Sequence, residues 1–210
     1  FLGATVGDLE DIVPGQVALA GYFCDNLDRP APEQRYLARQ LRYASRPGMA
    51  PANAIDLGDV NVFPLEPAKH FSAVQSQCAA VLKTGARMVL IGGDSSGLKA
   101  LRVAARNVSG ADVTVVSVAE GNTRNLHKKQ PVILSIDLHE LAGTWVSHPQ
   151  RLIGLSPAQM IALIDAAPGN IIGAALFGLA PALDSRGQTE THAALAILQT
   201  LAARLEKGAP

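Results

Sequence analysis

The chain has 210 residues, a length that suits one globular domain with a substantial core. Its composition, 48% hydrophobic and 17% charged, is ordinary for a soluble globular protein. Lys and Arg total 18, Asp and Glu total 18, and no run of like charge occurs. This balance argues against binding to nucleic acid or to an anionic membrane, because net charge drives both. We expect neither as a partner.

The chain carries no pattern typical of membrane insertion or export. Its longest apolar run, residues 171–183, is too short to span a bilayer and contains Gly and Pro. No basic segment leads into an apolar region at the first residues, as a secretory signal requires. Cys24 and Cys78 lie far apart without metal-binding spacing, which indicates free thiols. We therefore expect a cytoplasmic protein.

Apolar segments of strand length alternate with segments of helical periodicity. The predicted strands are residues 15–23, 54–60, 88–91, 112–118, 131–137 and 170–179. The predicted helices pass through residues 37–44, 71–82, 98–105, 156–164 and 194–205. Strands that are apolar on both faces are typical of a parallel sheet covered on both sides. We predict a single α/β domain over residues 1–210, a three-layer α/β/α sandwich with a mainly parallel sheet.

The turn at residues 92–97, Gly-Gly-Asp-Ser-Ser-Gly, follows the predicted central strand. Ligands of open α/β sheets collect outside such strand ends. We expect Ser95 or Ser96 to cap the helix that follows. The backbone amides of this turn could also hold an anion, although Asp94 argues against phosphate. Farther along, Ser156 to Gln159 has the form of a capping box with Pro at the first helical position.

Several segments, in order and spacing, resemble the ureohydrolase superfamily, the arginase and agmatinase group. The early ones are Gly21 to Asp25, similar to the family's first strand and turn, residues 54–60, similar to "DLGDV", and residues 85–96, similar to "GGDHS". The later ones are residues 115–123 at the place of "DAHxD", residues 135–139 at "SxDxD", residues 154–159 at "GLTxxE", and the closing helix at residues 184–194. The resemblance covers most of the chain and implies an arginase-like fold.

The same resemblance implies that the family's chemistry has been lost. Family enzymes hold two manganese ions with two histidines and four aspartates, and a bridging hydroxide attacks a guanidinium carbon. The matching positions here hold Ser95, Ala119, Gly121, Thr123, Asp137 and His139. The acidic residue expected to meet the guanidinium is replaced by Gly178. Two close divalent ions need several negative ligands, so we expect a degenerate member without the dimanganese centre.

The predicted fold is also shortened in the middle. Only a few residues separate the segment at 115–123 from Pro131, where family members carry a long segment. Either the lineage has deleted this segment or the sequence lacks it. Within this stretch, Asn125-Leu-His127 resembles an arginase-type "NLH" that carries a catalytic histidine. The alternative for His127 is a solvated loop histidine.

Asp137 and His139 are the main candidates for a rebuilt site. They lie two residues apart at a strand end, so we expect both side chains on one face. With Asp94 they could hold one metal ion. The alternative is that Asp94 and Asp137 cap helix ends or pair with backbone amides. The candidate ligand-binding residues are Asp94, Ser95 and Glu120, and the alternative for Glu120 is a surface carboxylate.

Two classes of function remain open. The first is a binding, regulatory or assembly subunit that contains no metal cofactor and takes a small-molecule ligand. It would form a homo-oligomer, or a hetero-oligomer with a ureohydrolase relative. The second is a hydrolase of a guanidine or amidine compound, with manganese or no metal, and a site rebuilt around Asp94, Asp137 and His139. A third, weaker possibility is a small-molecule sensor that uses the old cleft.

Overall fold

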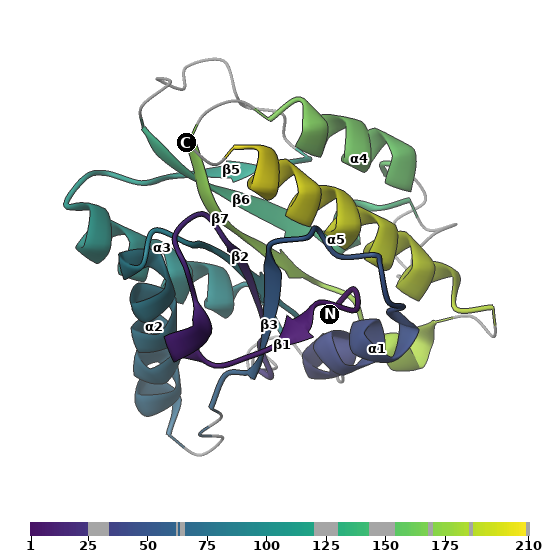
Figure 1. Ribbon diagram of the computed structural model, residues 1–210. Helices are drawn as coiled ribbons and strands as arrows, with labels where there is room; N and C mark the ends of the chain where they lie inside the picture. Colours follow the sequence, from purple (N-terminus) through teal and green to yellow (C-terminus); the bar gives the residue numbers. More distant parts are fainter. Residues whose placement is uncertain are drawn as a thin grey trace.

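The computed structural model describes residues 1–24, 34–61, 63, 66–119, 130–142, 154–167, 170–184 and 187–208. At its centre lies a seven-stranded sheet with the order β1-β3-β2-β4-β7-β6-β5 (Figure 1). All neighbouring strands in this sheet are parallel. The strands are β1 (Thr5–Val6), β2 (Val17–Gly21), β3 (Ala54–Asp59), β4 (Arg87–Ile91), β5 (Thr114–Ser117), β6 (Pro131–Asp137) and β7 (Asn170–Phe177).

Five α-helices cover the sheet on both faces. They are α1 (Leu37–Ala44), α2 (Pro67–Lys83), α3 (Ser96–Ser109), α4 (Pro157–Asp165) and α5 (Thr189–Lys207). Short 3-10 turns are η1 (Leu9–Asp11), η2 (Gln34–Tyr36), η3 (Leu138–Glu140) and η4 (Pro181–Leu183). Helices α2 and α3 pack on one face, and α1, α4 and α5 pack on the other (Figure 1). The predicted three-layer α/β/α sandwich is confirmed. None of the helices in the described ranges is long and apolar enough to cross a membrane.

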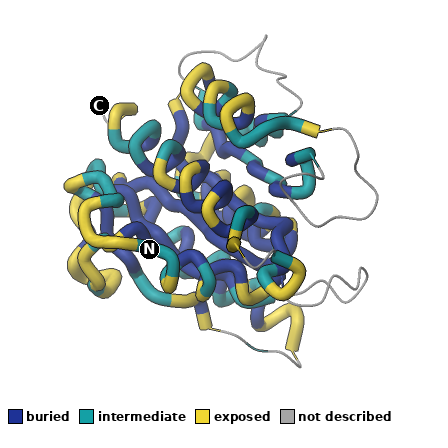
Figure 2. Tube along the Cα trace, turned by 90° about the vertical axis from the view of Figure 1, so that its right-hand side faces the viewer, coloured by how far each residue is buried: buried dark blue, intermediate teal, exposed yellow. Residues whose placement is uncertain are grey.

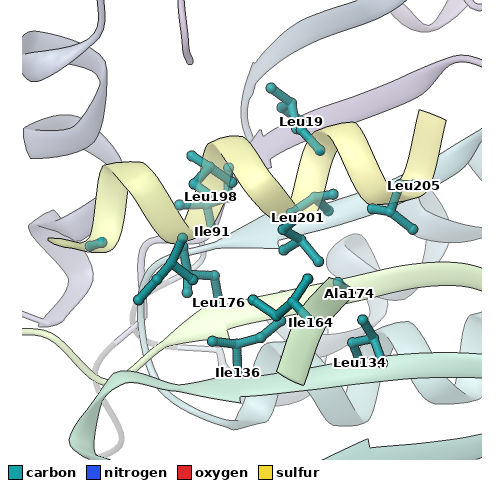
Figure 3. Packing of buried hydrophobic residues seen from close by; sticks show 14 of the residues in the cluster. Leu19, Ile91, Leu134, Ile136, Ile164, Ala174, Leu176, Leu198, Leu201 and Leu205 are labelled. Carbon is teal, nitrogen blue, oxygen red and sulfur yellow. The ribbon is translucent and has the colours of Figure 1, made fainter. Parts of the chain in front are cut away.

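Alternation along the central strands divides the core into two layers. In β4, Val89 and Ile91 pack in the layer under α1, α4 and α5, whereas Met88 and Leu90 pack under α2 and α3. Figure 3 shows the first layer, where Leu198 and Leu201 of α5 point toward the sheet. Burial is deepest along the strands, and exposed residues gather on the outer faces of the helices and in the turns (Figure 2).

The strand register aligns the carboxyl ends of four strands. Gly21 of β2 pairs with Ile91 of β4, and Ile91 pairs in turn with Leu176 of β7. On the other side of β7, Phe177 pairs with Asp137, the last residue of β6. The turns that follow β2, β4, β7 and β6 therefore lie side by side at one edge of the sheet. This edge carries most of the residues that the sequence singles out.

The two predicted helix caps have different outcomes. At α4 the capping box is confirmed, because Ser156 Oγ accepts from the Gln159 amide at 3.2 Å and Gln159 Oε1 accepts from the Ser156 amide at 2.8 Å. At α3 the predicted serine cap is wrong, because Ser95 makes no side-chain capping bond. Asp94 takes this role instead and accepts from the Ser96 amide at 2.8 Å. A carboxylate is a stronger acceptor than a hydroxyl for the amides at a helix N-terminus.

No disulfide joins Cys24 and Cys78 in the described part of the chain, as the spacing predicts. Cys78 lies fully buried among the apolar residues of α2, which agrees with a packing role. Burial raises the pKa of the Cys78 thiol to about 12, so it is protonated and unreactive at neutral pH.

Arg42 ties α1 to the end of β3. Its guanidinium donates to the Asp56 carboxylate at 3.0 and 3.1 Å, to the Gly58 carbonyl at 2.7 Å, and to Asp59. Asp56 is buried. Burial alone would raise its pKa, but hydrogen bonds from Arg42 and from the amino group of Phe1 outweigh burial and hold the pKa of Asp56 below its usual value.

We predict that Arg42→Gln lowers the free energy of unfolding by about 2 kcal/mol at pH 7, because it leaves Asp56 ionised and poorly compensated. A carboxyl whose pKa is depressed on folding contributes stability above its unfolded pKa of about 4, and loses it as the pH falls through the folded pKa. The difference between the variant and the wild type should therefore shrink below about pH 4. Urea denaturation across this range measures it.

Arg102→Gln is the matched control, because Arg102 is exposed on α3 and its substitution removes the same charge. It should change stability by less than about 0.5 kcal/mol. Equal losses in both variants would show that the Arg42 contacts contribute nothing specific.

Candidate functional site

Asp137 and His139 form a hydrogen-bonded pair where β6 ends. Asp137 Oδ1 accepts from the His139 backbone amide at 2.9 Å and lies 2.9 Å from His139 Nδ1. The structure brings the two side chains together as their spacing predicts, but by a different route. His139 lies in the η3 turn rather than on the strand, and Asp137 caps that turn. Both side chains are about one-third exposed, at 35% and 32%.

Gln34 links this pair to the turn after β4. Its Nε2 lies 3.1 Å from His139 Nε2, and its backbone carbonyl accepts from the Gly93 amide at 3.1 Å. Gln34 is 93% buried by residue area, with 7% exposed. The sequence contains no signal for this role, because Gln34 and His139 are 105 residues apart and come together only when the sheet folds.

Gly178, the first residue after β7, leaves space for the Asp137–His139 pair because it has no side chain. Its φ of +92° is a backbone conformation that other L-residues rarely adopt. A Cβ at this position would overlap Asp137 Oδ1 and lie 2.7 Å from His139 Nδ1. The Asp137–His139 pair thus fills the space where the resemblance implies an acidic side chain.

Asp94 makes a second polar cluster in the turn after β4. Its Oδ1 accepts from both the amide and the hydroxyl of Ser96, and Ser96 Oγ lies 2.6 Å from the Tyr22 hydroxyl. The side chain is buried, yet its Oδ2 meets no hydrogen-bond partner in the described part of the chain. The capping interpretation of Asp94 therefore explains one carboxylate oxygen and leaves the other unpaired.

His70 completes this cluster from the first turn of α2. Its ring stacks on Tyr22 at 5.3 Å between centroids, and its Nε2 is buried without a partner within the described ranges. Burial lowers the pKa of His70, while the Asn61 carbonyl and the Asp94 charge partly oppose this effect. Burial likewise raises the pKa of Tyr22. The sequence offers one signal for a buried His70, because the residue lies four positions before Val74 on the apolar face of α2.

Three backbone amides of the turn after β4, which the sequence suggests could hold an anion, are bonded within the protein. Gly92 donates its amide to the Leu176 carbonyl at 2.8 Å, and Gly93 donates to Gln34. The Ser96 amide donates to Asp94. These backbone donors are already satisfied within the protein, so they are not available to an anion.

The residues at the expected metal positions do not fit a dinuclear centre. Ser95 offers only an exposed hydroxyl and Ala119 only a methyl group. Asp137 uses Oδ1 for His139. Across the described ranges, no three His, Cys, Asp or Glu side chains are grouped so that they could hold a metal ion. A mononuclear site of Asp94, Asp137 and His139 would need these side chains to move together, and it stays a prediction.

Two of the candidate residues lie outside the described residues. Glu120 and His127 both fall in the stretch 120–129. Their predicted roles, in ligand binding and in catalysis, are untested. His192 is exposed on α5.

Gly178→Ala tests how closely the Asp137–His139 pair is packed. Gly110 is the matched control, because its φ is +62° and nothing lies within 4 Å of a Cβ there. Both alanine variants carry the strain of a positive φ, about 1–2 kcal/mol. Gly178→Ala should cost a further 1–3 kcal/mol or so, because its methyl group overlaps the pair. Urea unfolding of both variants measures the difference, and equal costs would contradict this packing.

Comparisons with known proteins agree with the observed fold. Residues 16–119 match the model of the Arginase family. The fold is similar to a hypothetical agmatinase from Burkholderia thailandensis, with a TM-score of 0.79, 18% identity, and coverage of 99% of this chain and 91% of that one. It is also similar to proclavaminate amidino hydrolase from Streptomyces clavuligerus, with a TM-score of 0.80, 16% identity and coverage of 99% and 97%.

A third similar structure is a quadruple mutant of an arginase-like protein from T. brucei. Its TM-score is 0.68 at 15% identity, with coverage of 95% of this chain and 92% of that one. In that mutant three serines are replaced by aspartate and one arginine by histidine. No curated protein sequence matches the chain significantly.

Proposed function

Because this chain belongs to the arginase family, we propose that it is a ureohydrolase-fold protein without dimanganese amidinohydrolase activity, serving as a binding, regulatory or assembly subunit. One observation carries the proposal. Asp137, the carboxylate kept at an expected metal position, is hydrogen-bonded to His139, and this pair lies against Gly178. A carboxylate engaged with a neighbouring imidazole, with only a hydroxyl and a methyl group at nearby ligand positions, supplies too little negative charge for two divalent ions.

The T. brucei arginase-like protein supports this reasoning. Its quadruple mutant gains aspartate and histidine side chains in place of serine and arginine. Those gained residue types are the ones absent here at Ser95, Ala119, Gly121 and Thr123. Structures of the arginase fold thus include an arginase-like protein with serine or arginine at the four positions that the mutant changes.

Asp94 is the group that we assign to a small-molecule ligand. Its buried Oδ2 is an acceptor without a donor, and leaving such an atom unpaired costs about 1–3 kcal/mol. A ligand that donates a hydrogen bond at this turn would remove that cost. Ser95 lies exposed next to Asp94, and Glu120 completes the proposed set. We further propose that the protein assembles with itself or with a ureohydrolase relative.

A second candidate function rests on the geometry of the Asp137–His139 pair. A carboxylate bonded to Nδ1 orients an imidazole and stabilises its protonated form, as general bases in hydrolases require. In this alternative the protein hydrolyses a guanidine or amidine compound, with Asp137 and His139 as the site and His127 assisting. Nε2 of His139 lies against the Gln34 amide, so substrate would have to displace Gln34.

Manganese analysis combined with an activity assay separates the two candidates. We expect protein purified without chelators and supplied with manganese to retain much less than one ion per chain. We also expect it to release no urea or ammonia from arginine, agmatine or guanidinobutyrate. The physical reason is the shortage of carboxylate ligands beside Asp137.

Asp137→Asn is the matched variant, because it keeps the shape of the side chain and removes its charge. Under the binding proposal, Asp137→Asn leaves the manganese content unchanged, and neither the variant nor the wild type releases urea or ammonia. Stoichiometric manganese with urea release that Asp137→Asn abolishes would establish the hydrolase instead. Turnover without bound metal that this variant abolishes would do the same for a metal-free site.

A further inference from the structure

Two arginines converge at the opposite end of the sheet, where the parallel strands begin. Arg87 opens β4 and is buried, with 5% of its area exposed, and Arg204 lies half-buried in the last turns of α5. Arg87 Nη2 donates to the Gly208 carbonyl. Arg204 Nη1 lies 3.4 Å from the point where a Cβ on Gly208 would sit. Both guanidinium groups therefore approach the same residue.

Neither arginine has an acidic partner among the residues that the structure describes. Arg87 Nε donates to the Ile171 carbonyl at 3.1 Å, and Arg204 Nη2 donates to the Ala167 carbonyl at 2.7 Å. The remaining nitrogen of Arg87, Nη1, is buried and has no partner in the described chain. Burial and the like charge of Arg204 both lower the pKa of Arg87. Two neighbouring cations without a counter-charge are unfavourable unless an anion joins them.

A capping role explains only part of this arrangement. Arginines near helix C-termini commonly donate to the last carbonyls and interact favourably with the helix dipole. Such a role explains the bonds to Ala167 and Gly208, which follow the ends of α4 and α5. It does not explain the unpaired Nη1 of Arg87, nor the placement of a second guanidinium beside the first one.

We propose that Arg87 and Arg204 form a binding site for a small oxyanion, a carboxylate or a phosphate, at the amino end of the sheet. The anion accepts charge-assisted hydrogen bonds from Arg87 Nη1 and from the Arg204 guanidinium. Arg87 Nη1 is covered in the ligand-free protein, so binding includes a shift of the guanidinium that uncovers it. Half-buried Arg204 provides the route from solvent. The site lies at the opposite end of the strands from Asp94 and Asp137, and it does not depend on the proposed function.

Thermal unfolding with added anions tests the site. Inorganic phosphate and acetate are titrated separately at constant ionic strength, with chloride as the balancing salt. A saturable rise in Tm of about 3–5 °C at ten times the Kd is expected from at least one of them. The arm that responds identifies the ligand as a phosphate or a carboxylate.

Arg204→Gln should reduce this rise in Tm by more than half. Lys207→Gln is the matched control. Lys207 is exposed and lies one helical turn after Arg204, so this variant removes the same charge and should leave the rise in Tm unchanged. Arg87→Lys keeps the buried charge but loses the fork of donors, so it should weaken binding while the protein stays folded. No saturable response to either anion, or equal losses in Arg204→Gln and Lys207→Gln, would overturn the proposal.

Discussion

The alignment of four strand ends by a parallel register is the constraint on which the candidate site depends. It places Asp137 directly beside the start of the turn after β7, where Gly178 has no side chain. The carboxylate of Asp137 closes onto His139 in that space, and Gln34 covers the imidazole from the neighbouring turn. A local pairing of protein groups thus stands where the resemblance implies metal ligands and substrate.

The sequence predicted the fold well because the signals were local and repeated. The apolar strand segments and the helical periodicity predicted the three layers, and the capping box at Ser156 predicted where α4 begins. Strand β1 was missed, because two residues held only by pairing with β3 carry no pattern of their own. Gln34 and His70 were missed because their partners, His139 and Tyr22, lie far away in sequence. The α3 cap was misassigned because Asp94 and the two serines can each accept from nearby amides.

Unpaired buried polar atoms occur at both ends of the sheet. Asp94 Oδ2 and His70 Nε2 lie near the carboxyl ends of the strands, and Arg87 Nη1 lies at their amino ends. Native proteins pair most such atoms with protein groups or ordered water, so a bound water or ligand would supply the missing partner at each of these three atoms. The signs of the two ends differ. The carboxyl end offers a carboxylate to a hydrogen-bond donor, whereas the amino end offers guanidinium groups to an anion.

The most direct test of the account is a crystal structure grown with excess manganese, with anomalous scattering recorded at the metal's absorption edge. The account predicts no anomalous peak beside Asp137, and a carboxylate that still contacts His139 over Gly178. Two strong peaks bridged by a solvent oxygen at this edge of the sheet would contradict it.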